Sequence, residues 1–173
     1  SPARAVIRWE NLAAATAFTD TIPGLVGGGP ATANLMEDFA VAVDSGGNAM
    51  VMWRQNGDAE LVVAIYDSTR TRVRGPISVD MLFGFSAPYG FVNLPVHTYR
   101  QYGVTALSRN TFLVTATGGG RVWARVYRHQ PAPLPPVVGP PLWLTPSGKN
   151  CRFPSVTASS RYGLITWYGN VHQ

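Results

Sequence analysis

Short runs of alternating apolar residues, separated by glycine-rich turns, limit the folds open to this chain. The clearest run is FAVAVDSGGNAMVMWR, residues 39–54. Phe39, Val41 and Val43 alternate with alanine and aspartate, and a second alternating run follows the break Ser-Gly-Gly-Asn. Successive side chains of a β-strand point to opposite faces, and Gly and Asn favour turns. The stretch therefore predicts an antiparallel hairpin, which needs further strands to be stable.

Further strands follow the same pattern. The segments that predict them are residues 61–66, 111–117, 121–128 and 155–167. The first of these, LVVAIY, is wholly apolar, which predicts burial on both faces. The glycine turn at residues 118–120 makes residues 111–128 a second expected hairpin, and residues 155–167 are expected to form a last one. In residues 121–128 the alternation predicts that Val122 and Val126 face inward while Trp123 and Tyr127 face outward. With 18 Gly and 14 Pro punctuating the strands, we expect an all-β domain, a sandwich or a barrel of about eight strands.

A proline-rich segment lies near the C-terminal end of the sequence. Residues 130–146 hold seven prolines, so they form neither a helix nor a central strand. They predict an extended arm, partly polyproline II, that lies on a surface.

Arginine carries almost all of the positive charge. The net charge is +5, from 14 Lys and Arg against 9 Asp and Glu, and Lys149 is the only lysine. Arg70, Arg72 and Arg74 recur at a spacing of two, which in an extended segment predicts a basic stripe on one side. Such a stripe suits nucleic-acid phosphates or an acidic partner, whereas a solvated surface is the simpler explanation, and the sequence leaves both open.

Few residues are suited to catalysis or to metal binding. The chain has one cysteine, Cys151, and three widely separated histidines, so neither a disulfide framework nor a metal site is expected. It contains no Gly-x-Ser-x-Gly and no His-Glu-x-x-His motif. We therefore expect no enzyme, no cofactor and no metal. No apolar run approaches the roughly 18 residues that a membrane span needs.

Three stretches resemble bacterial β-propeller repeats. VAVDSGGNAMVMW (residues 41–53), followed by a strand ending in Tyr66-Asp67, is similar to one blade of that family. Weaker echoes begin at Val104 (VTALSRNTFLV) and Val156 (VTASSRYGLITW), at uneven spacings of 63 and 52 residues. Propellers close with about four or more blades. This resemblance therefore implies a chain that dimerises or that belongs to a longer protein.

The order of segments along the chain also resembles a picornavirus-like capsid protein. Residues 25–58 are similar to the central segment of that family, residues 85–103 to its Pro- and Tyr-rich stretch, and residues 111–136 to its closing strands and proline-rich exit. The turn Gln101-Tyr102-Gly103 departs from the family pattern at its middle residue, and an Arg usual between the prolines is missing. The chain begins at Ser1 and ends at Gln173, residue types that flank cleavage sites in the polyproteins of such viruses.

The capsid resemblance implies an eight-stranded antiparallel jelly-roll β-sandwich with a proline-rich C-terminal extension. Residues 1–130 would form the jelly roll. Residues 131–173 would form the proline-rich arm and a final hairpin, packed on the same domain or on a neighbour.

The function implied by this resemblance is that of a structural capsid subunit in the virion of a small non-enveloped icosahedral RNA virus. Its partners would be other capsid subunits, of the same and of different kinds, and its loops would attach to a host receptor. Arg-rich surfaces suit contacts with neighbouring subunits or with packaged genomic RNA. The alternative is a secreted β-propeller-type module that binds carbohydrate or protein.

Overall fold

The structure is a computed structural model that describes residues 4–11, 16–23, 36–55, 60–79, 82, 102–118, 120–130, 134–146, 151–159 and 162–169. The elements with defined bounds in these ranges are thirteen β-strands, which confirms the expected all-β class. They pair antiparallel in four sheets, here named A to D in chain order.

The strands follow one another through the four sheets. Sheet A contains β1 (Arg4–Asn11) and β2 (Thr16–Pro23). Sheet B contains β3 (Met36–Val43), β4 (Ala49–Gln55), β5 (Glu60–Tyr66) and β6 (Arg72–Ser78). Sheet C contains β7 (Tyr102–Ser108), β8 (Thr111–Gly118) and β9 (Arg121–Arg128), with β10 (Val137–Val138) and β11 (Leu142–Trp143) both paired to β9. Sheet D contains β12 (Cys151–Ala158) and β13 (Gly163–Gly169).

Hydrogen-bonded neighbours within each sheet are mostly consecutive along the chain. Sheet B has the order β3-β4-β5-β6, and sheet C has the order β7-β8-β9-β10. A jelly roll instead joins strands that are distant in sequence through Greek-key connections. The expected eight-stranded jelly roll is therefore not confirmed, and the capsid function stays a prediction.

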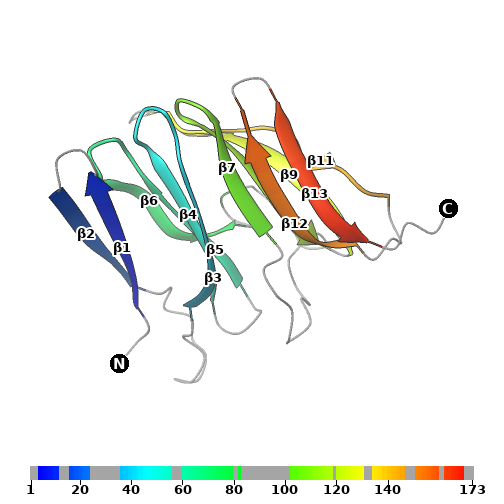
Figure 1. Cartoon of the computed structure of the whole chain (residues 1–173), viewed down its shortest axis with the longest axis horizontal. Helices are drawn as coiled ribbons and strands as arrows, with labels where there is room; N and C mark the ends of the chain where they lie inside the picture. The colour runs from blue at the N-terminus through cyan, green and yellow to red at the C-terminus, as the bar shows by residue number, and fades with distance from the viewer. Residues whose placement is uncertain are drawn as a thin grey trace.

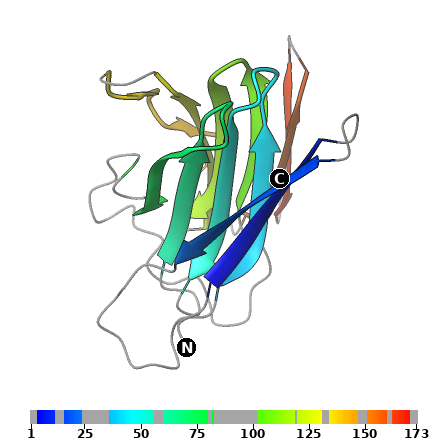
Figure 2. The same ribbon diagram turned by 90° about the vertical axis from the view of Figure 1, so that its left-hand side faces the viewer.

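The four sheets are stacked in chain order, from sheet A at one end to sheet D at the other (Figures 1 and 2). One hydrophobic core lies between sheets B and C, and a second lies between sheets A and B. Strand β4 contributes to both because alternate side chains of a strand point to opposite faces. Met50 and Met52 belong to the first core, whereas Val51 and Trp53 belong to the second.

The three expected hairpins are confirmed as β3–β4, β8–β9 and β12–β13. Residues 61–66 are all buried, as their wholly apolar sequence predicts. The expected outward orientation of Trp123 and Tyr127 is wrong, because these side chains are 1% and 0% exposed and pack in the core between sheets B and C. Val122 on the other face is buried as well. Both faces of β9 are covered around these residues, so alternation does not separate an inner from an outer face there, whereas Val126, which was expected to face inward, is 38% exposed.

The proline-rich segment joins sheet C, and the last hairpin packs against sheet C as a separate sheet. Strands β10 and β11 extend its outer edge by pairing with β9. Sheet D packs on β7 and β8, where a Cβ at Gly103 would lie 3.1 Å from a methyl carbon of Val156. Glycine at this position therefore allows the two sheets to approach closely. Within the described ranges, no helix has the length and apolarity needed to cross a membrane.

Candidate ligand-binding site

The carboxylate of Asp44 links the β3–β4 turn of sheet B to the β7–β8 turn of sheet C by hydrogen bonds. Asp44 Oδ1 accepts hydrogen bonds from the backbone N–H groups of Gly46 and Asn48, at 2.7 and 2.9 Å. Asp44 Oδ2 accepts from Asn48 Nδ2 at 2.8 Å and from the backbone N–H of Asn110. Burial alone would raise the pKa of Asp44, but these hydrogen bonds outweigh it and hold the pKa below its ordinary value.

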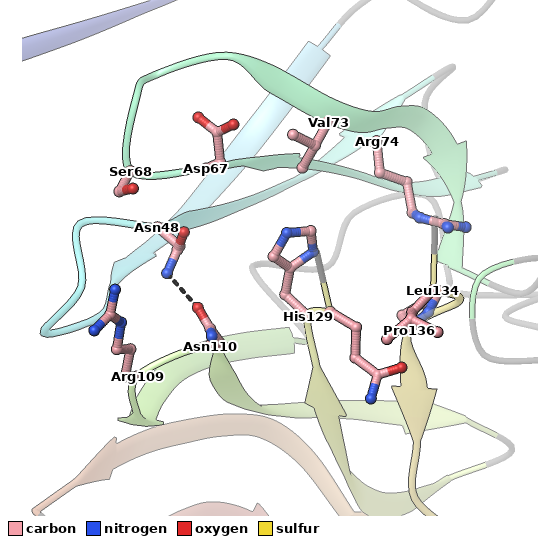
Figure 3. Close-up of a pocket in the computed structure, with 11 residues that line it drawn as sticks. Asn48, Asp67, Ser68, Val73, Arg74, Arg109, Asn110, His129, Leu134 and Pro136 are labelled. Carbon is pink, nitrogen blue, oxygen red and sulfur yellow. Dashed lines mark hydrogen bonds between the residues drawn. The ribbon is translucent and has the colours of Figure 1, made fainter. Parts of the chain in front are cut away.

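The amide side chains of the two turns also bind each other. Asn48 Nδ2 donates to Asn110 Oδ1 across 2.7 Å, the bond drawn in Figure 3. Asn48 directly precedes β4, and Asn110 directly precedes β8. The two asparagines therefore hold corresponding places in neighbouring sheets and fix the spacing of the sheets at this end.

Asp67 and His129 form a second corresponding pair, because one follows β5 and the other follows β9. Asp67 Oδ1 accepts hydrogen bonds from the N–H groups of Thr69 and Thr71, at 2.9 and 3.0 Å, and from Thr69 Oγ1 at 2.6 Å. Burial opposes the ionised form of Asp67. The hydrogen bonds and the nearby His129 outweigh this effect, so the pKa of Asp67 lies below its ordinary value.

A pocket of about 530 Å³ opens between these turns, where sheets B and C meet (Figure 3). We call it the B–C pocket. Val73, Leu134 and Pro136 supply apolar parts of its wall, and Ser68 and Gln130 supply polar groups. Its size falls within the range of roughly 300–1,000 Å³ that small-molecule sites occupy.

Positive charge predominates among the residues that line the B–C pocket. Arg74 and Arg109 lie on opposite sides of it with His129 between them (Figure 3). Within the described ranges neither guanidinium takes part in a salt bridge. Asp67 is the one carboxylate among the described lining residues. With the two arginines it gives these residues a net charge of +1 when His129 is neutral and of +2 when His129 is protonated.

The position of His129 controls its protonation. Burial is the main cause that lowers the pKa of His129 below 6.5, and Arg74 acts in the same direction. Asp67 and Asp44 oppose these effects, but they do not overcome them. The imidazole is therefore neutral at physiological pH and gains its proton only when the pH falls through this lowered pKa.

The structure does not bring the three arginines of the expected basic stripe together. Arg72 pairs with Tyr66 and Arg74 pairs with Ile65, with a shift of register between the two pairs. This irregularity places Arg72 and Arg74 on opposite faces of sheet B, and only Arg74 lines the B–C pocket. Arg70 lies in the preceding turn with φ of 69°. The chain ends Ser1 and Gln173 fall outside the described residues.

Sequence reasoning missed Arg109 and His129 as site residues. Neither belongs to a motif, and they are far from Arg74 along the chain. One sequence signal could have found Arg109. The segments VDSGGN and LSRN occupy corresponding places in two of the repeat-like stretches, and this correspondence puts Asn48 and Asn110 at matching turns. Aligning these turns would have placed Arg109 beside the β3–β4 turn. In the part of the chain that the structure describes, no three His, Cys, Asp or Glu residues gather as a metal site would require.

No protein-family model, curated protein or solved structure matches this chain. The resemblances to capsid proteins and to propeller repeats therefore remain predictions from the sequence.

Proposed function

We propose that this chain is a β-propeller-type binding module that holds an acidic carbohydrate in the B–C pocket. The observation that carries the proposal is the convergence of Arg74, Arg109 and His129 on one concave pocket between neighbouring sheets. The binding role is proposed as non-enzymatic, and secretion remains the localisation expected for such a module.

The arrangement of the sheets supports a propeller-type architecture. Each blade of a propeller is a four-stranded meander, and successive blades stand face to face around an axis. Sheet B is such a meander, and sheet C repeats its first three strands. Val41, Val104 and Val156 open the three repeat-like stretches, and together they line a cavity of about 380 Å³ between β3, β7 and β12. Corresponding residues of successive blades meet in this way along a propeller axis.

The chemistry of the B–C pocket supports an anionic ligand. Guanidinium groups bind carboxylates through two parallel hydrogen bonds, and two of them face this pocket. Among the described residues that line the pocket none is Trp, Tyr or Phe, so these residues offer a neutral sugar no aromatic surface on which to stack. The pocket volume suits one or two sugar units, whereas a protein partner would need a broader contact surface.

A catalytic role has little support in the same residues. The carboxylates of Asp44 and Asp67 are engaged by the hydrogen bonds of their own turns. Both pKa values lie below the ordinary value, so both groups stay ionised and are poor proton donors.

Replacing Arg74 or Arg109 by alanine is expected to weaken binding of an acidic sugar by about 10- to 100-fold, because each change removes a charge-assisted hydrogen bond. The measurement is isothermal titration calorimetry with glucuronate, using glucose as the neutral counterpart. The matched control is Arg128→Ala, which removes an exposed arginine from β9 outside the pocket and should leave affinity unchanged. Equal binding of glucose and glucuronate, or no binding of either, would contradict the proposal.

Lowering the pH from 7.5 through the pKa of His129 is expected to strengthen binding of glucuronate by roughly fivefold to tenfold. His129 is neutral at the upper value because its pKa lies below 6.5, and it becomes charged as the pH falls through that pKa. A sugar carboxylate with a pKa near 3.5 stays ionised above about pH 4.5, so the protonated imidazole attracts it. The variant His129→Asn should lose this pH dependence. If the affinity of the wild type for glucuronate decreased on acidification, the proposed role of His129 would be wrong.

A further inference from the structure

One face of sheet B is covered over only part of its width. Sheet A packs on β4 and β5, where Val51 is 1% and Trp53 0% exposed. This cover stops short of β3, whose side chains on the same face, Phe39, Val41 and Val43, are 40%, 56% and 52% exposed. We call these three residues the inner patch. Phe39 stacks on Trp53 with 6.2 Å between ring centroids, so the inner patch continues the existing interface between sheets A and B.

One face of sheet C shows the complementary pattern. Sheet D covers β7 and β8, where Thr115 is fully buried and a Cβ at Gly163 would lie 3.2 Å from Leu113. The cover stops short of the outer strands. There Val126, Val137 and Leu142 are 38%, 50% and 61% exposed on the same face. We call these three residues the outer patch.

The two-stranded sheets A and D cover opposite halves of their neighbouring sheets. Sheet A lies over the later strands of its neighbour, and sheet D lies over the earlier strands of its neighbour. The far face of each is exposed and carries an apolar side chain, Val6 at 66% in sheet A and Leu164 at 61% in sheet D. Placed edge to edge, β12–β13 and β1–β2 would make a four-stranded meander like sheet B.

We propose that two copies of this chain complete each other's half-sheets. Hairpin β12–β13 of one copy covers the inner patch of the other copy. Hairpin β1–β2 of that other copy covers the outer patch of the first. The same exchange occurs twice, so the contact closes on itself and leaves no half-sheet over. Two copies then contain four complete sheets, B and C of each copy, and two sheets that form by joining sheet D of one copy to sheet A of the other. These six sheets would be six blades, within the range of about 4–8 that propellers use.

A second copy is favoured over a different protein because this chain carries both missing halves. An unrelated partner would have to supply a hairpin for the inner patch and another for the outer patch. Edge strands β1 and β13 would also gain hydrogen-bond partners, which removes exposed sheet edges. The inference uses the propeller-type architecture proposed above but not the ligand. Sugar binding and oligomeric state are measured separately, so either can fail without the other.

The test is the mass of the protein in solution, measured by sedimentation equilibrium at micromolar concentration. The wild type is expected to have twice the mass of one chain. Val41→Arg and Leu164→Asp each place a charge in the buried contact and should weaken dimerisation at least about 100-fold. The matched control is Val73→Arg, which changes a valine that is 41% exposed on β6 and outside both patches, and it should stay dimeric.

Mixing the two interface variants separates lost contact from lost folding. A copy with Val41→Arg has an intact β12–β13 hairpin, and a copy with Leu164→Asp has an intact inner patch. The mixture should therefore form a heterodimer in which one contact is unchanged and the other pairs opposite charges. A monomeric wild type, an assembly larger than a dimer, single variants that remain dimeric, or a mixture that remains monomeric would each overturn the proposal.

Discussion

Replacing Trp53 by alanine is expected to lower the free energy of unfolding by about 3–5 kcal/mol. The side chain is fully buried between sheets A and B, among Val51, Val62 and Ala64. Its removal takes away a large apolar contact and leaves a cavity that rigid strands on both sides cannot fill by collapsing. Sheet A contacts sheet B through this core, so the variant should also loosen β1 and β2. Urea denaturation gives the free energy, and amide hydrogen exchange gives the local effect.

The matched control for Trp53 is Tyr162→Ala. Tyr162 is a large aromatic residue that is 77% exposed, so its removal should change the free energy of unfolding by less than about 0.5 kcal/mol. Trp53→Phe should fall between the two because the smaller ring keeps part of the packing. A loss below about 1 kcal/mol for Trp53→Ala would mean that sheets A and B are not packed as described.

Replacing Asp44 by alanine is expected to cost about 2–4 kcal/mol of folding free energy, because several donors lose a charged acceptor at once. Asp44 is 6% exposed, and the donors are two backbone N–H groups of its own turn, the Asn48 side chain, and the N–H of Asn110 in the next sheet. The control is Asp67→Ala, which removes hydrogen bonds to Thr69 and Thr71 of its own exposed turn and should cost about 1 kcal/mol. Thermal and urea unfolding measure both. Equal costs would show that the link between sheets B and C adds no stability.

The stability supplied by Asp44 should depend on pH with a definite sign. The folded pKa of Asp44 is lower than the ordinary value of 3.8, so the unfolded chain binds a proton more readily. Its contribution is therefore complete above about pH 5 and is lost as the pH falls through the folded pKa. In Asp44→Asn this acid-sensitive part is absent. The unfolding free energies of wild type and variant should converge as the pH falls below 5 and through the folded pKa, and parallel curves would contradict the role of the charge.

The local structure of the strands and turns follows from the sequence. FAVAVDSGGNAMVMWR specifies β3, its turn and β4 because alternation and Gly-Asn turn chemistry act over a few residues. The burial of residues 61–66 also follows from their composition, since a wholly apolar strand has no face that water favours. In its described part, residues 134–146, the proline-rich segment adds two short strands to sheet C, which agrees with the N–H groups that prolines lack.

The candidate site required information that no local pattern contains. Arg74 appeared in the sequence as one member of a stripe with Arg70 and Arg72. A register shift in β6, set by pairing with β5, separates Arg72 from Arg74 and turns Arg74 toward sheet C. His129 and Arg109 reach the same pocket from other strands, so their association depends on how two sheets face each other.

The sequence by itself determined the all-β class, the hairpins and the strand buried on both faces, because alternation and turn preference are properties of neighbouring residues. Only the tertiary structure decided which sheets face each other, that Trp123 and Tyr127 point into a core, and that Asn48 and Asn110 are bonded across 2.7 Å. These features depend on contacts between segments far apart in the chain. A strand can show the same alternation whether one or both of its faces are covered. The burial of each face therefore depends on which sheets pack against it.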